Sequence, residues 1–199
     1  MNPKQKIAVI APLVLVAVMY PIFHSLAAVM NDRVAWYLGL AIYWIIWCFV
    51  FPLLIIGKEA IKKLIRPRKP DKKILFLIAI PLLGAVAGRI LLGGYEKESV
   101  WIALLLFSTP FGNGFFEEVL WRGVYVKLFP NNVFFWMIWP SVWFALWHYA
   151  PGSVSSGNPS RLIIGAGVMG LYLSFLARKT NTVWWGIVVH TVGGIIMVV

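Results

Sequence analysis

The segment IAVIAPLVLVAVMYPIFHSLAAVM, residues 7–30, decides the fold, because it contains no acidic residue, no lysine and no arginine. A hydrocarbon core about 30 Å thick is crossed by roughly 20 apolar helical residues, so this segment is long enough to span a membrane. It is also long for the apolar core of a signal peptide, and no clear cleavage site of small residues follows it. We therefore expect it to be retained as a membrane-spanning helix.

The same apolar character runs through the chain of 199 residues, which is 61% hydrophobic and 13% charged, with a mean hydropathy of +0.83. A soluble domain of this size could not bury so much apolar surface. The apolar segments are continuous rather than alternating, which favours helices over the strands of a membrane barrel. We expect an all-α, polytopic transmembrane bundle that forms a single integral membrane domain over residues 1–199. Seven spans are predicted, near residues 7–30, 34–57, 74–94, 99–129, 133–150, 161–177 and 182–199.

The net charge of the chain is +11, and its lysines and arginines are most concentrated in a basic segment, residues 58–73, between the second and third predicted spans. Membrane proteins concentrate lysine and arginine at the cytoplasmic ends of their spans, so this segment predicts topology and contact with the lipid bilayer, not a nucleic-acid partner. We expect the amino terminus and the segment to be cytoplasmic, the carboxy terminus to be outside, and the membrane to be a prokaryotic cytoplasmic (inner) membrane. The cations expected on the inside with the segment are Lys4, Lys6, Lys127, Arg178 and Lys179, and those expected outside are Arg33, Lys97 and Arg161.

Acidic residues inside an apolar span are costly, so their positions indicate functional sites. Of the seven acidic residues in the chain, Glu117 and Glu118 are the two that fall inside a predicted span. Glu118 and Arg122 stand four positions apart, so they can pair on one face of a helix, whereas Glu117 points about 100° away. We interpret Glu118 with Arg122 as a structural pair and Glu117 as the carboxylate that faces a cavity. The alternative is an ion-pair network that only ties helices together.

Two histidines lie in other predicted spans at a depth similar to that of Glu117. His148 follows Phe144 by one helical turn, and His190 lies in the last predicted span. A carboxylate and two imidazoles in a wet intramembrane cavity can hydrolyse an amide, because the carboxylate takes a proton from water and imidazole donors stabilise the oxyanion. The same Glu117, His148 and His190 are also a set that can hold zinc with an open water position, although the usual His-Glu-x-x-His signature is absent. The residues alone do not decide between a metal-bound and a carboxylate-activated water.

Three motifs in residues 100–199 resemble those of the CAAX protease and bacteriocin-processing family, also called the Abi family, of intramembrane endopeptidases. An EExxxR motif, an FxxxH motif and a further histidine occur in the family's order on separate predicted spans. The residues concerned are Glu117, Glu118 and Arg122, then Phe144 and His148, then His190. The resemblance places the catalytic core at about residues 100–199, while the amino-terminal half is similar only as a generic set of spans.

By this resemblance, Glu117 would activate water, His148 and His190 would position the water or stabilise the oxyanion, and Glu118 with Arg122 would orient the site. A glutamate-type enzyme would need no cofactor, whereas a metal-dependent one would use zinc. The implied substrate is a membrane-tethered protein or peptide. It would be a prenylated tail, a pheromone or bacteriocin leader, or a carboxy-terminal sorting tail, whose cleavage would end in hydrolysis or in transfer of the acyl group.

One position departs from the family pattern. The last motif commonly reads HxxxN, and Gly194 stands where the asparagine is expected. Asn113, one turn before Glu117, is a candidate for the missing amide donor. Gly194 also leaves open a non-catalytic membrane protein, such as an immunity factor or scaffold. A proton-coupled transporter is a third hypothesis, because paired acids and histidines also form proton relays, although the lack of a recognisable repeat counts against it.

Overall fold

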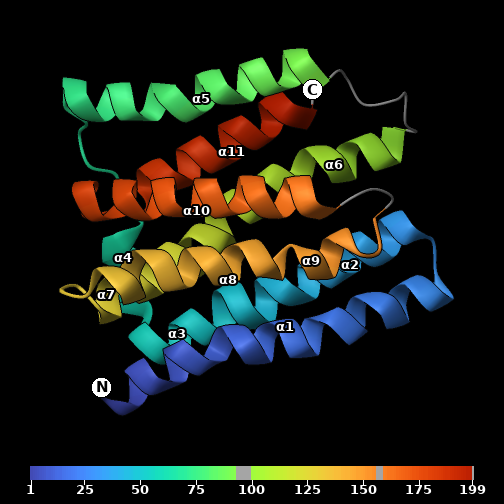
Figure 1. Cartoon of the computed structure of the whole chain (residues 1–199), viewed down its shortest axis with the longest axis horizontal. Coiled ribbons are helices and arrows are strands. Elements are labelled where there is room, and N and C mark those ends of the chain that lie inside the picture. The colour runs from blue at the N-terminus through green and yellow to red at the C-terminus, as the bar shows by residue number, and fades with distance from the viewer. Residues whose placement is uncertain (93–99, 156–158, 199) are drawn as a thin grey trace.

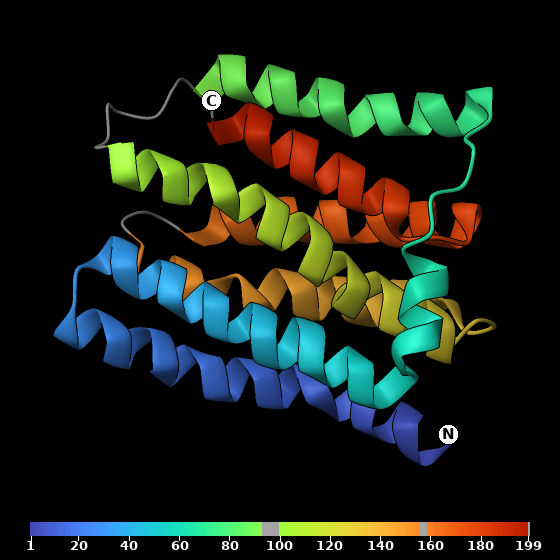
Figure 2. The same cartoon turned by 180° about the vertical axis from the view of Figure 1, so that it is seen from behind.

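The computed structural model describes residues 1–92, 100–155 and 159–198, which are helical apart from short connections (Figure 1). No β-strand occurs within these ranges, so the predicted all-α class is confirmed. Both views show the long helices side by side, with their axes close to the long direction of the molecule (Figures 1 and 2). Such a bundle suits an apolar sequence, because in lipid a helix satisfies its backbone hydrogen bonds internally.

The amino-terminal half consists of three long helical runs and one short helix. Its elements are α1 (Pro3–Val29), then α2 (Asp32–Tyr43), η1 (Trp44–Val50) and α3 (Phe51–Ile56) in one run, then α4 (Lys58–Leu64) and α5 (Lys72–Leu92). The element η1 is a π-helix, in which backbone hydrogen bonds join residues five apart and widen the coil. Helix α4 falls inside the basic segment, which the sequence indicated only as a loop. It escaped prediction because it is short and largely polar.

The carboxy-terminal half contains the elements that carry the three motifs. Its elements are α6 (Val100–Gly112), η2 (Asn113–Val124) and α7 (Tyr125–Leu128) in one run, then η3 (Phe134–Ile138), α8 (Trp139–Trp147) and α9 (Tyr149–Gly152), then α10 (Pro159–Thr180) and α11 (Trp184–Val198). Both η2 and η3 are π-helices. The glutamate pair lies on η2, Phe144 lies on α8 and His190 lies on α11. Three separate helical runs therefore meet at the site.

Several helices are long and apolar enough to cross a membrane. Within the described ranges these are Pro3–Val29, Asp32–Ile56, Lys72–Leu91 and Pro159–Thr180, and Trp184–Met197 is a shorter apolar helix. They confirm an integral membrane protein with several spans, while the full count of seven stays a prediction. The expected outside cation Lys97 lies beyond the described residues.

The core of the bundle is strongly aromatic. Tyr43, Trp121, Phe144 and Trp147 are each at most 1% exposed, and they bring together the run of α2, the π-helix η2 and helix α8. Exposed apolar side chains occur along α1, α5 and α10, which is the surface expected of helices that face lipid. The packed interior is thus concentrated around the part of η2 that carries the glutamates.

The basic segment is fastened across one end of the bundle. The backbone N–H of Val183 and the hydroxyl of Thr182 donate to the carbonyl of Leu64, at 2.8 and 2.6 Å. The indole of Trp185 donates to the carbonyl of Arg68 at 3.0 Å. These bonds tie the segment to the turn between α10 and α11 and to the first turn of α11, the helix that carries His190.

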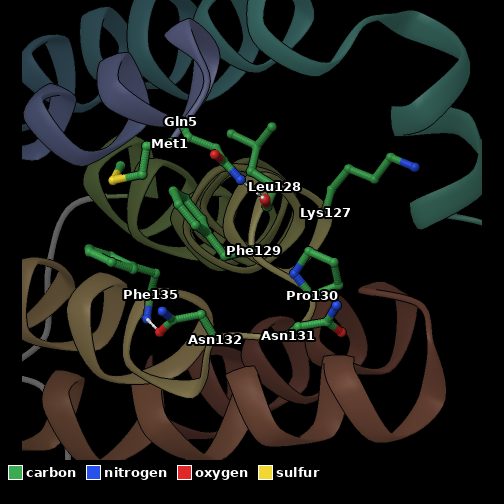
Figure 3. A pocket seen from close by; sticks show the side chains of 9 residues that line it. All are labelled: Met1, Gln5, Lys127, Leu128, Phe129, Pro130, Asn131, Asn132 and Phe135. Atoms are coloured by element: carbon green, nitrogen blue, oxygen red, sulfur yellow. Dashed lines mark hydrogen bonds between the residues drawn. The ribbon is translucent and has the colours of Figure 1, made fainter.

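The amino terminus lies at this same end of the bundle, beside the end of α7 (Figure 2). The Gln5 side-chain amide donates to the Leu128 carbonyl at 2.7 Å, next to a cavity of about 540 Å³ (Figure 3). Lys127 extends away from the other side chains around this cavity, which include Phe129 and Phe135. The cavity is therefore apart from the glutamate pair, which stands earlier in the same helical run.

Candidate active site

The two glutamates are buried in η2, with 1% of Glu117 and none of Glu118 exposed. Arg122 Nη1 lies 3.1 Å from Glu118 Oε1, which confirms the predicted pairing of these residues. The contact is an ion pair between two buried, oppositely charged side chains. The guanidinium also lies over the ring of Phe144, 4.2 Å from its centroid, which adds a cation–π attraction from α8. Arg122 thus compensates the charge of Glu118 and links η2 to α8.

His190 contacts both glutamates. Its Nδ1 lies 3.1 Å from Glu118 Oε1, and its Nε2 lies 3.7 Å from Glu117 Oε2. The sequence predicted separate surroundings for the two acids on an α-helix. The π-helical coil of η2 reduces the angle between neighbouring side chains, so both carboxylates reach the same imidazole. π-Helical turns are frequent at functional sites.

The hydrogen-bonding roles of His190 follow from its partners. Glu118 faces the guanidinium of Arg122 and so acts as an acceptor, which assigns the proton on Nδ1 of His190 to a bond toward Glu118. The Nε2 atom is then directed at Glu117. Gly186, one turn earlier on α11, makes this approach possible, because a Cβ there would lie 2.6 Å from Glu118 Oε2.

His148 is held by the backbone at the joint between α8 and α9, and not inside a continuous helix as predicted. Its Nδ1 lies 2.6 Å from the carbonyl oxygen of Phe144. A carbonyl can only accept, so Nδ1 carries the proton and Nε2 of the neutral ring is an acceptor. The Phe144 ring stands edge-on to both imidazoles, with centroid distances of 4.6 Å to His148 and 6.3 Å to His190. His148 thus joins the cluster through Phe144.

The structure gives Gly194 a packing reason. A Cβ at this position would lie 2.9 Å from Cβ of Pro110, so α11 and α6 are too close there for an asparagine side chain without movement. Asn113, the candidate replacement, is the first residue of η2, and its Oδ1 accepts a hydrogen bond of 3.0 Å from Trp44 Nε1. An indole only donates, so the oxygen of the amide faces Trp44 and the NH₂ group is directed elsewhere.

The sequence left open whether zinc is held at this site. Within residues 1–92, 100–155 and 159–198, no three His, Cys, Asp or Glu side chains are placed to hold a metal ion. Both nitrogens of His190 face carboxylates, and Nδ1 of His148 is directed at a carbonyl. Glu117, His148 and His190, the residues expected to hold zinc, are not gathered as such a set in this arrangement, and no step proposed below passes through a metal.

A side chain from the amino-terminal half also packs against the helices that carry the site, and the sequence did not predict it. Trp121 Nε1 donates to the hydroxyl of Tyr43 at 2.7 Å, and the Tyr43 ring stacks on Trp147 at 3.9 Å. A tyrosine within an apolar span was the available signal, because a buried hydroxyl needs a polar partner.

The helical bundle defines an integral membrane protein, and its interior holds a buried cluster of charged and polar side chains. Residues 99–196 match the sequence model of a family described as type II CAAX prenyl endopeptidase Rce1-like, so this part of the chain is similar to that family. The match confirms the predicted kinship with CAAX proteases and supports a CAAX-protease type of membrane enzyme. No curated protein and no solved structure matches the chain.

Proposed function

We propose that the protein is an intramembrane endopeptidase of the glutamate type, which hydrolyses a peptide bond of a membrane-associated protein or peptide. The observation that supports this most directly is the placement of His190, whose Nδ1 contacts Glu118 while its Nε2 faces Glu117. Glu118, whose charge is compensated by Arg122, thereby orients the imidazole of His190 toward Glu117. This is the geometry by which a carboxylate fixes the orientation of a histidine in other hydrolases.

Glu117 is the proposed general base. Its Oε2 is buried and has no hydrogen-bond partner among the described residues, so it presents a free acceptor to a water molecule. Arg122 pairs with Glu118, which leaves Glu117 without a cation of its own on η2. A carboxylate in this position can take the proton of water as the water oxygen attacks the carbonyl carbon of the substrate.

The two histidines have different proposed roles because their exposed nitrogens differ. His148 offers Nε2 as an acceptor, which orients the second hydrogen of the attacking water. Nε2 of His190 faces the same side of the site as Glu117, and a proton on this nitrogen would be donated to the oxyanion. The amide NH₂ of Asn113 is a second proposed donor to this oxyanion. Glu117 then passes its proton to the leaving amine as the carbon–nitrogen bond breaks.

The proposed substrate is anchored in the bilayer, because the site lies within a bundle whose surface is apolar. The family description names prenyl endopeptidases, and a prenylated tail is accordingly the first candidate. A pheromone or bacteriocin leader and a carboxy-terminal sorting tail are the others, with acyl transfer as the alternative outcome for a sorting tail. We further propose seven spans in an inner membrane, with residues 58–73 and the amino terminus cytoplasmic and the carboxy terminus outside. The fastening of the basic segment at the end where the chain begins supports this topology.

The test is cleavage of lipid-anchored peptides by the purified protein in liposomes, with products identified by mass spectrometry. We expect cleavage by the wild type and a loss of about 10²- to 10⁴-fold in Glu117→Gln, which keeps the shape but removes the base. Glu59→Gln is the matched control, because Glu59 lies on α4 with its side chain 76% exposed. Full activity in Glu117→Gln would refute the assignment, and activity lost on chelation would refute the metal-free mechanism.

The alternative hypothesis, a scaffold or immunity protein, is motivated by Gly194. It predicts partner binding by the wild type that is unchanged in Glu117→Gln, together with no cleavage of any anchored peptide. A proton-coupled transporter would show flux that depends on a pH gradient in the same liposomes.

A further inference from the structure

Trp44 begins η1 in the amino-terminal half of the chain, and its indole reaches the first residue of η2. The run of α2 and η1 lies beside η2 (Figure 2). The Nε1 group of Trp44 donates a hydrogen bond of 3.0 Å to Oδ1 of Asn113. An indole can only donate, so this bond takes the oxygen of the amide and leaves the NH₂ group on the other branch. Trp44 therefore fixes which way round the amide stands.

The indole of Trp44 is held in a narrow site between helices. It is 7% exposed, its ring stacks on Phe116 with centroids 6.3 Å and planes 18° apart, and Tyr37 meets it edge-on at 6.0 Å. Gly112, the last residue of α6, leaves room for the ring, because a Cβ there would lie 2.6 Å from the indole. Close-packed neighbours of this kind keep the indole from turning away, so it is a rigid donor.

The NH₂ end of the amide belongs to the face of η2 that carries the glutamates. Backbone hydrogen bonds of a π-helix join residues five apart, so Glu117 and Glu118, four and five residues after Asn113, follow it by one turn. Because Cα–Cβ bonds tilt toward the amino-terminal end of a helix, the side chain of Glu117 starts out toward Asn113. The NH₂ group makes no hydrogen bond to another described residue, so it can donate to an acceptor on this face.

We infer that Trp44 is a positioning residue for Asn113: its indole holds the amide oxygen, so that the NH₂ group is presented on the glutamate face of η2. This inference rests on the proposed function, in which that NH₂ group donates to the oxyanion. It also gives the amino-terminal half a part in the site, because Trp44 lies outside the matched residues 99–196. The amide that Gly194 cannot supply from α11 would then come from η2 and be oriented by η1.

Kinetics of Trp44→Phe, alone and together with Asn113→Ala, test this role, because a residue that acts only through Asn113 has no effect once the amide is gone. We expect kcat to fall about 10²-fold in Asn113→Ala, as for the loss of one oxyanion donor, and about 10-fold in Trp44→Phe, with KM within about twofold of the wild type. The double variant should be no slower than Asn113→Ala. Wild-type kcat in Trp44→Phe, or a double variant slowed by the product of the two single losses, would overturn the inference.

Trp139→Phe is the matched control for the smaller ring. The indole of Trp139 packs against Phe134 and Trp143 at the start of α8, and its Nε1 has no hydrogen-bond partner among the described residues. The change removes the same atoms as Trp44→Phe but breaks no hydrogen bond, so kcat should stay close to the wild-type value. An equal loss of kcat in both variants would assign the effect to the ring and not to the N–H group, and would also overturn the inference.

Nuclear magnetic resonance of the isotope-labelled protein in micelles tests the positioning without relying on turnover. The NH₂ signal of Asn113 is identified as the pair of cross-peaks lost in Asn113→Ala. We expect nitrogen relaxation to show an ordered amide in the wild type and in Trp139→Phe, and a loss of order in Trp44→Phe. An equally ordered amide in Trp44→Phe overturns the inference even if the wild type cleaves its substrate. A loss of order supports the inference even if no substrate is cleaved, so its failure and the failure of the proposed function are distinguishable.

Discussion

Replacement of Arg122 by methionine is the sharpest test of how the buried charges stabilise the bundle. Arg122 and Glu118 are 1% and 0% exposed, and their ionic contact measures 3.1 Å. Methionine fills much of the same space but removes the charge, so the Glu118 carboxylate would keep the Nδ1 proton of His190 as its remaining described contact. The cation–π contact with Phe144 would be lost as well.

The expected size of the effect follows from this burial. Breaking a buried ion pair on one side lowers the free energy of unfolding by about 3–5 kcal/mol, because an uncompensated charge stays inside. The double change Glu118→Gln with Arg122→Met should lose less than Arg122→Met alone, since no net charge is then buried and the introduced amide oxygen can still accept from His190. The sign of this difference separates a charge effect from a packing effect.

Unfolding by denaturant in detergent micelles measures these values. Lys62→Met is the matched control, because the Lys62 and Glu59 side chains lie at a comparable 3.0 Å but are 56% and 76% exposed. Such an exposed pair contributes less than about 1 kcal/mol. The reasoning is refuted if Arg122→Met changes the free energy of unfolding by no more than Lys62→Met does, or if the double variant is the least stable of all.

Two further predictions concern glycines of α11. Gly186→Ala should reduce kcat at least tenfold without unfolding the protein, because the new Cβ would lie 2.6 Å from Glu118 Oε2 and displace the carboxylate that orients the imidazole. Gly165→Ala, with nothing within 4 Å of its Cβ, should leave activity and folding intact, and equal activity in both variants would contradict the close approach. Gly194→Asn should lower the unfolding midpoint and bring no gain in cleavage, since its Cβ would lie 2.9 Å from that of Pro110; a faster enzyme in the cleavage assay would count against this packing.

The sequence predicted the elements of the site that depend on local spacing. The pairing of Glu118 with Arg122 followed from their separation of four residues, and the contact of His148 with Phe144 followed from one helical turn. Helical class and membrane character followed from continuous apolar segments. These features depend on neighbours in the chain, which a single sequence displays.

Features that depend on tertiary packing could not be predicted in the same way. His190 reaches both glutamates because η2 is a π-helix, and no pattern of residues in the sequence predicted a π-helix there. The Tyr43 hydroxyl accepts a hydrogen bond from Trp121 of another helical run, and nothing in the spacing links these two residues. The meaning of Gly194 depended on the proximity of Pro110, which only the packed helices reveal.

The fastening of residues 64–68 to the turn before α11 has a consequence for where a substrate would be cut. Lysine and arginine side chains of such a segment bind anionic lipid headgroups. The turn fastened to the segment would therefore be held at the membrane surface and would fix the depth at which α11 begins. His190 stands six residues after Trp184, the first residue of α11, which is about 9 Å along a helix axis. A scissile bond that reached His190 would therefore lie at a nearly constant depth below the lipid surface. The number of residues between this bond and the membrane anchor of the substrate, more than the sequence around the bond, would then determine where the substrate is cut.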